Sequence, residues 1–211
     1  MSDALRKAIV AAGRRMAELG LTHGTAGNIS ARTAEGMLIT PSNVPYDVLS
    51  ADDVVAVTLR GEPLDASSRR PSTEWRMHGG VYVTREDVQA VVHTHSPHAT
   101  ALSCTRRSIP PFHYMVAVAG GSDVPCTEYA PFGSGELACH TAGALAQRNA
   151  CLLANHGVLA VGSSIDAALA LALEVEKLAQ QYILALQAGG PVLLSDAEME
   201  EALRAFGEYR R

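Results

Sequence analysis

Apolar side chains recur at helical spacing in several stretches of the chain. Residues 3–19 place leucine, isoleucine, valine and methionine three and four positions apart, and a glycine follows as a stop. The same spacing predicts a long helix over residues 166–186 and a last helix over residues 196–209. Shorter helices are expected over residues 71–83, where a proline and two hydroxyl residues open the segment, and around residues 136–148.

Short apolar runs bounded by turn residues predict strands between these helices. The runs are residues 37–40, 54–59, 88–95, 115–119, 151–154 and 158–161. No internal repeat, low-complexity tract or linker interrupts them. We therefore expect one α/β domain over residues 1–211.

Composition narrows the possible partners. The net charge of −5 favours neither nucleic acid nor an anionic membrane as a partner. The N-terminus lacks the apolar core of a signal peptide, and the apolar run at residues 167–173 is too short to span a bilayer. The four cysteines show neither a CxxC pair nor a disulfide-framework spacing, so we expect buried, reduced thiols in a cytoplasmic protein.

The motif His93-Thr94-His95 ends one of the predicted strands. Residues i and i+2 of a strand project to the same face, so both imidazoles lie together. Neutral imidazole nitrogens are good ligands for a divalent metal. Taken alone, the pair fits equally well two histidines that hydrogen-bond to backbone carbonyls.

Two further residues extend this motif. His156 lies where another apolar run breaks, in a position that mirrors His93 and His95. Glu74 lies near the start of a predicted helix, where an ordinary acid interacting with the helix dipole is the simple alternative. His78, one turn later, is expected to be a helix-face histidine. Three imidazoles and a carboxylate would leave room on a metal for a substrate carbonyl, with the carboxylate moving a proton beside it.

Three segments of small polar residues complete the set of candidate chemistry. Residues 24–30, 40–43 and 72–73 combine glycines, hydroxyls, an asparagine and a helix start. Each could be a plain turn, but together they can bind a phosphate without a lysine. Metal-assisted enediolate chemistry on a phosphorylated sugar fits this inventory.

Several motifs recur in the order and at the intervals of a known family. They are Gly24-Thr25-Ala26-Gly27-Asn28, Met37-Leu38-Ile39-Thr40-Pro41, Pro71-Ser72-Thr73-Glu74-Trp75-Arg76, His93-x-His95, Ile109-Pro110 with His113-Tyr114-Met115, Phe132-Gly133 and His156-Gly157. Over nearly its whole length the chain resembles the class II aldolase/adducin family. The resemblance implies a three-layer α/β/α sandwich around a central, largely antiparallel sheet, and reversible aldol cleavage of a ketose 1-phosphate.

The resemblance also implies roles for individual residues. His93, His95 and His156 match the family's zinc-binding histidines, with Mn²⁺ or Co²⁺ as other possible metals. Glu74 matches the acid that approaches the metal and transfers the proton. Tyr114 matches a tyrosine that acts on the aldehyde oxygen from a neighbouring subunit of a C4 homotetramer.

The substrate would be held by a second set of matching positions. The phosphate side comprises Thr25, Asn28, Ser42, Asn43, Ser72 and Thr73, and the aldehyde side comprises Phe132 and Tyr209. Asn43 stands where the relatives have glycine, and the chain ends two residues after Tyr209. Three alternatives remain: a pentulose-5-phosphate 4-epimerase, a sugar-acid phosphate decarboxylase, and a metal-free adducin-like interaction module.

Overall fold

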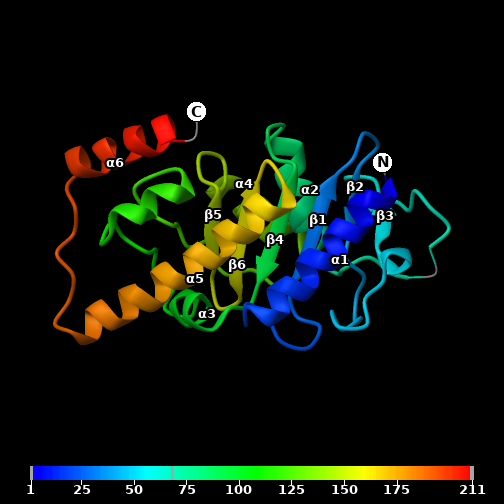
Figure 1. Cartoon of the computed structure of the whole chain (residues 1–211), viewed down its shortest axis with the longest axis horizontal. Helices are drawn as coiled ribbons and strands as arrows, with labels where there is room; N and C mark the ends of the chain where they lie inside the picture. Colours follow the sequence, from blue (N-terminus) through cyan, green and yellow to red (C-terminus); the bar gives the residue numbers. More distant parts are fainter. Residues whose placement is uncertain (1, 68, 210–211) are drawn as a thin grey trace.

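The computed structural model describes residues 2–67 and 69–209. The strands are β1 (Asn28–Arg32), β2 (Met37–Ile39), β3 (Val55–Val57), β4 (Ala90–Thr94), β5 (Ala150–Leu153) and β6 (Gly157–Gly162). The helices are α1 (Ser2–Glu18), α2 (Trp75–Thr84), α3 (Pro97–Ser103), α4 (Gly135–Ala144), α5 (Ile165–Gln187) and α6 (Asp196–Tyr209), with 3₁₀ helices η1 (Ala51–Asp53) and η2 (Tyr114–Ala119). Figure 1 shows their arrangement along the molecule.

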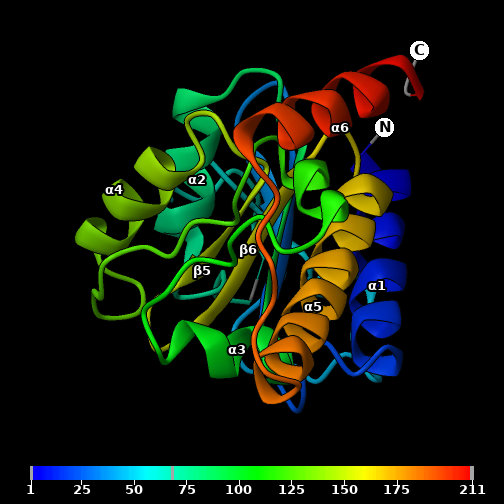
Figure 2. The same ribbon diagram turned by 90° about the vertical axis from the view of Figure 1, so that its left-hand side faces the viewer.

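The described strands form one six-stranded sheet in the order β3-β2-β1-β4-β6-β5, and every neighbouring pair is antiparallel. Figure 2 shows the sheet nearly edge-on, with α1 and α5 on one side and α2 and α4 on the other. The three-layer α/β/α fold with its antiparallel sheet is therefore confirmed.

Each face of the sheet has its own apolar core. Side chains alternate along β4, so Val91 packs in the cluster shared with α2 and α4, whereas Val92 packs in the cluster shared with α1 and α5. A strand buried on both faces has no polar face. This explains why β4 appears in the sequence as a continuous apolar run rather than as an alternation.

Pairing across β4 determines where the polar ends of several strands meet. Asn28, the first residue of β1, lies directly opposite His93 of β4. On the other side of β4, Thr94 pairs with Val158, which follows Gly157 at the start of β6. The end of β4 is thus flanked by the beginnings of two neighbouring strands.

Several predicted elements differ from the observed ones. The apolar run 115–119 was expected to be a strand, but it belongs to η2, which packs its valines and alanines into the core without pairing to the sheet. A short apolar run shows burial but not conformation, so this prediction was wrong. β1 begins inside the small polar segment noted at residues 24–30, and α3 lies immediately after the turn at Ser96.

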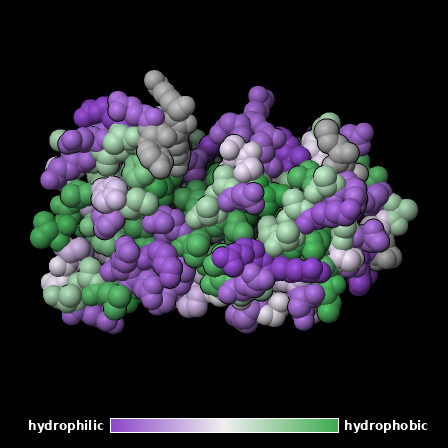
Figure 3. All heavy atoms as spheres, viewed as in Figure 1, coloured by the Kyte–Doolittle hydropathy of each residue, from purple (hydrophilic) through white to green (hydrophobic). Residues whose placement is uncertain are grey.

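The surface carries some exposed apolar side chains outside the sheet region. Val192 and Leu193 lie in the segment between α5 and α6, whose region appears green at the left edge of Figure 3. Cys151 is buried, but Cys104 and Cys139 are exposed, so the expectation of four buried thiols was wrong for these two. Among the described helices, none combines the length and apolar character needed to cross a bilayer.

Candidate active site

Four residues from three parts of the fold meet at the end of β4. Glu74 immediately precedes α2, His93 lies in β4, His95 follows that strand, and His156 lies in the turn between β5 and β6. One ligand atom from each residue lies within 4.8 Å of those from the others. The structure therefore brings together all four residues expected to bind the metal.

The histidine rings direct their Nε2 atoms toward one another. The Nδ1–H of His93 donates to the Val158 carbonyl at 2.8 Å, which leaves Nε2 without a proton in the neutral ring. This Nε2 lies 2.9 Å from Nε2 of His95. The three rings stand nearly perpendicular to one another, with centroids 4.7–5.0 Å apart. Such a convergence of lone pairs suits a cation.

Glu74 closes the cluster on its fourth side. Its Oε2 accepts a hydrogen bond from Asn28 Nδ2 at 2.9 Å and lies 3.2 Å from His93 Nε2. Its Oε1 lies 3.2 Å from His156 Nε2, yet it is buried without a hydrogen bond among the described groups. A buried carboxylate oxygen without a partner is costly, and a bound cation would satisfy it. The donor set thus fits a divalent metal held by three histidines and one carboxylate.

The ionisation of Glu74, His95 and His156 agrees with that fit, whereas the burial of His93 is outweighed by its contact with Glu74, which raises the pKa of His93. Burial opposes ionisation of Glu74, but His93, His156 and the Asn28 amide outweigh it and hold the pKa of Glu74 below its usual range. Burial and the neighbouring histidines lower the pKa of His95 to about 3 and that of His156 to about 4. Neutral imidazoles and an ionised carboxylate are the forms that bind metals.

Glycines allow the backbone to approach this cluster closely. A Cβ on Gly157 would lie 2.3 Å from the Thr94 carbonyl oxygen and within 3.3 Å of the His93 and His95 rings. Gly27 has a positive φ of 72°, and a Cβ there would lie 2.6 Å from the His93 carbonyl oxygen. Both positions therefore require glycine for the observed packing.

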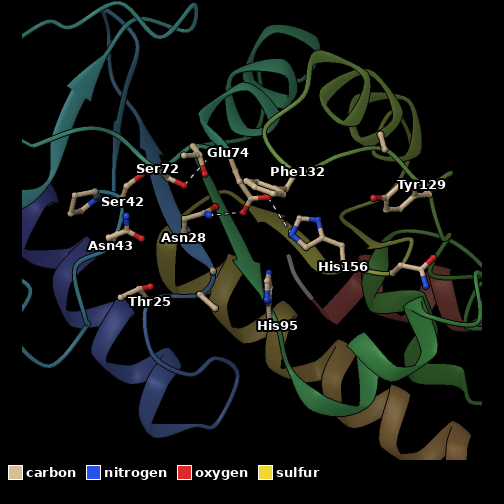
Figure 4. A pocket seen from close by; sticks show the side chains of 16 residues that line it. Thr25, Asn28, Ser42, Asn43, Ser72, Glu74, His95, Tyr129, Phe132 and His156 are labelled. Atoms are coloured by element: carbon tan, nitrogen blue, oxygen red, sulfur yellow. Dashed lines mark hydrogen bonds and ion pairs between the residues drawn. The ribbon is translucent and has the colours of Figure 1, made fainter.

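The cluster opens into a pocket of about 330 Å³. Figure 4 shows Glu74 near its centre, with Asn28 on one side and His156 on the other. The expected substrate-binding residues that line the pocket are Thr25, Asn28, Ser42, Asn43, Ser72, Thr73 and Phe132. His93 lies beneath this surface, fully buried.

The segments expected to bind a phosphate are held together by their own hydrogen bonds. Ser42 Oγ donates to the Pro71 carbonyl at 2.9 Å, and the Ser72 amide donates to the Thr40 carbonyl at 3.0 Å. Asn43 has a φ of 58°, a conformation that asparagine tolerates better than most residues other than glycine. No lysine or arginine occurs among the described residues that line the pocket, so hydroxyls, amides and backbone groups form the polar wall.

Tyr114, expected on the aldehyde side, does not lie in the pocket of this chain. Tyr114 begins η2, is 54% exposed, and stacks on His113 and Phe206 away from the cluster. Tyr209 is the last residue of α6, and its side chain lies outside the described part of the structure. Tyr114 is therefore not brought to Glu74 within one subunit.

The structure adds residues that the sequence did not single out. Tyr129 and Asn155 line the pocket, and Asn155 precedes His156 with a positive φ of 55°. His78 was expected on a helix face, but it is fully buried and contacts Asn28. The sequence could have suggested Asn155, because it directly precedes the candidate ligand His156. It could not have suggested the contacts of His78, which arise only from the packing of α2 on β1.

Comparison with known proteins identifies the family. The sequence profile described as "Class II Aldolase and Adducin N-terminal domain" matches residues 7–183. The chain belongs to this family. It is an aldolase of the aldehyde-lyase class, and its site is suited to a divalent metal.

Named relatives are similar over almost the whole chain. A 5-methylthioribulose-1-phosphate/5-deoxyribulose-1-phosphate aldolase from Rhodospirillum rubrum is 48% identical over 98% of this chain and 92% of its own length. An L-fuculose phosphate aldolase from Escherichia coli is 47% identical, with coverage of 92% and 90%. A solved structure of an L-fuculose 1-phosphate aldolase superposes with a TM-score of 0.93 at 40% identity, covering 97% of this chain and 96% of its own.

Proposed function

We propose that the protein is a zinc-dependent aldolase that reversibly cleaves a ketose 1-phosphate to dihydroxyacetone phosphate and an aldehyde. The observation that carries this proposal is the placement of Glu74 and three histidines in a pocket whose other wall consists of small polar segments. A carboxylate beside a metal site and a lysine-free phosphate wall are the parts that this reaction needs.

When bound by His93, His95, His156 and Glu74, Zn²⁺ would supply Lewis-acid stabilisation of the negative charge that develops on the ketose oxygens. Glu74 moves the proton at C3: as the ionised carboxylate it removes this proton in the synthetic direction, and as the protonated acid it returns the proton to C3 after the C3–C4 bond breaks, becoming ionised again. The depressed pKa of Glu74 keeps it ionised and therefore ready to accept a proton.

Asn28, Ser42, Ser72 and Thr73 orient the phosphate, with Thr25 and Asn43 beside them. This binding holds C3 at a constant distance from Glu74. Orientation of this kind contributes to rate as well as to affinity, because it fixes the reacting atoms before the chemical step.

The aldehyde side is completed by a second subunit. Tyr114 is exposed and remote from the pocket of its own chain, so we assign it to a neighbour's site in a C4 homotetramer. There its hydroxyl group donates a proton to the aldehyde oxygen in the synthetic direction, and its phenolate takes the proton of the C4 hydroxyl group in cleavage. Phe132, 72% exposed at the pocket rim, and Tyr209 border the aldehyde fragment.

The relatives suggest which substrates to test. L-fuculose 1-phosphate releases lactaldehyde, whereas 5-deoxy- and 5-methylthioribulose 1-phosphates release acetaldehyde and (methylthio)acetaldehyde. The apolar ring of Phe132 suits the short apolar tails of the latter pair. A panel of these ketose phosphates, with dihydroxyacetone phosphate detected by an NADH-coupled assay, tests the proposal.

The same assay separates the alternatives. An epimerase rejoins its fragments and a decarboxylase releases CO₂, so neither accumulates dihydroxyacetone phosphate. Metal analysis addresses the interaction module: we expect one Zn²⁺ per subunit, lost in His95→Ala. We expect it to be retained in His98→Ala, because the His98 ring lies outside the cluster and contacts Glu176 instead. Full zinc loading of His95→Ala would contradict the ligand set.

A further inference from the structure

A row of buried polar groups extends from Glu74 into the protein, away from the pocket. Its members are Asn28, His78, Ser30 and Tyr82, each no more than 3% exposed. They belong to β1, a strand of the sheet, and to α2, which covers one face of the sheet. Apolar residues of similar size would fill this space at lower desolvation cost, so the polar row needs an explanation.

The direction of each hydrogen bond in the row follows from Glu74. An ionised carboxylate only accepts, so Asn28 Nδ2 donates to Glu74 Oε2 at 2.9 Å. The other end of the same amide, Oδ1, lies 2.5 Å from His78 Nε2, which must therefore carry the proton.

The remainder of the row completes this pattern. With Nε2 protonated, His78 Nδ1 is an acceptor, and Ser30 Oγ donates to it at 2.7 Å. Ser30 Oγ in turn accepts from the Tyr82 hydroxyl at 2.8 Å. Burial lowers the pKa of His78 to about 3, so the ring stays neutral and keeps one donor and one acceptor.

We infer that His78 is a positioning residue for Glu74, acting through Asn28. The Nε2–H of His78 holds the Asn28 amide with its nitrogen toward the carboxylate of Glu74. The hydrogen bond from Asn28 Nδ2 then fixes Glu74 Oε2, while Oε1 of the same carboxylate faces His156. If the His78 donor is lost, the amide can turn over and present Oδ1 to Glu74, where two acceptors repel each other. The inference rests on the proposed role of Glu74 in proton transfer.

Two amide substitutions of His78 separate positioning from simple core filling. His78→Gln can place a donor near the former Nε2, whereas His78→Asn reproduces only the Nδ1 side and leaves Asn28 Oδ1 without its donor. We expect kcat for ketose phosphate cleavage to fall about 10–100-fold in His78→Asn, typical of lost support behind a metal site. His78→Gln restores most of this loss.

The loss includes a fall in kcat, because Glu74 acts on the reacting carbon; KM rises as well, since Asn28 also lines the pocket and is proposed to bind the phosphate. Val81→Ala is the matched control, since Val81 is fully buried on the same helix but lies in the apolar cluster. It lowers the free energy of unfolding and leaves kcat close to the wild-type value. Equal kcat values in His78→Asn and His78→Gln, or a loss confined to KM, overturn the inference.

An NMR experiment on the zinc-loaded protein needs no turnover. In ¹⁵N-histidine-labelled protein, we expect His78 to be protonated at Nε2 and bare at Nδ1 across neutral pH. A proton on Nδ1 overturns the inference whatever the kinetics show. If the wild-type protein cleaves no ketose phosphate but shows the expected tautomer, the proposed function fails while the hydrogen-bonded row stands.

Discussion

At the scale of single residues, the surroundings of Glu74 decide between two roles that the sequence left open. As a first-turn acid, its side chain would lie at the surface beside a helix start. Instead it is 7% exposed, precedes the first residue of α2, and contacts histidines from β4 and from the β5–β6 turn. The sequence could suggest a functional acid, but only the packing of three elements distinguishes the two roles.

The first prediction concerns Glu74→Gln. The helix dipole alone would contribute about 0.3–1 kcal/mol to stability and nothing to chemistry. A proton-transfer group matters more, so we expect a rate loss of about 10²–10⁴-fold with zinc still bound. The measurement is exchange of the C3 hydrogen of dihydroxyacetone phosphate with deuterated water, without an aldehyde. Tyr114→Phe serves as the control and retains exchange, and wild-type exchange in zinc-loaded Glu74→Gln would refute the mechanism.

A second prediction uses the pKa of His78 in the metal-free protein. In the unfolded chain, His78 binds a proton as the pH falls through 6.5. In the folded protein, burial lowers the pKa of His78 to about 3, so the ring stays neutral until the pH falls to that value. Stability contributed by this site is therefore lost as the pH falls, by up to about 1.4 kcal/mol per pH unit. Urea unfolding of chelator-treated wild type and His78→Gln, from neutral pH to about 4, should give converging stabilities. Parallel curves would show that His78 is not buried in its neutral form.

At the scale of secondary structure, the sequence predicted long amphipathic helices and apolar strands well. α6 was predicted with its observed bounds, and α5 to within one residue at each end. Short segments were harder to predict. A 3₁₀ helix such as η2 can bury the same short apolar run that a strand would bury. β1 begins with polar residues that face the site, so it lacks an apolar pattern at its start. The type of such residues is determined by the pocket that they line rather than by the strand, so the period of apolar positions does not predict their conformation.

The third prediction tests the close packing between β4 and β6. Gly157→Ala places a methyl group against the Thr94 carbonyl and beside the His93 and His95 rings. We expect a loss of about 1–3 kcal/mol in the free energy of unfolding, together with weaker zinc binding in a chelator competition. Gly143→Ala in α4, which meets nothing within 4 Å, should instead stabilise the protein by about 0.5–1 kcal/mol. Equal stabilities of the two variants would contradict this account.

At the scale of the whole molecule, the pocket of one chain lacks Tyr114, the residue expected to act on the aldehyde oxygen. The four candidate metal ligands and the small polar segments expected to bind a phosphate lie around one pocket of a single chain. Tyr114 instead packs against Phe206 of α6, away from that pocket, and more than half of its side chain is exposed. A residue that acts across an interface shows no intrachain signal, so only the resemblance suggested its role.

The last prediction tests this assignment by mixing subunits. Glu74→Gln and Tyr114→Phe should each be nearly inactive in aldehyde-forming cleavage when refolded alone. Refolded together, they form oligomers in which some interfaces join an intact Glu74 to an intact Tyr114, so part of the activity returns. The recovery should depend on the mixing ratio and be greatest near equal amounts. Mixing the two variants after separate folding is the control, and it should give no recovery while subunits do not exchange. If verified mixed oligomers recovered no activity, Glu74 and Tyr114 would have to act within the same subunit, which the position of Tyr114 in the present fold opposes.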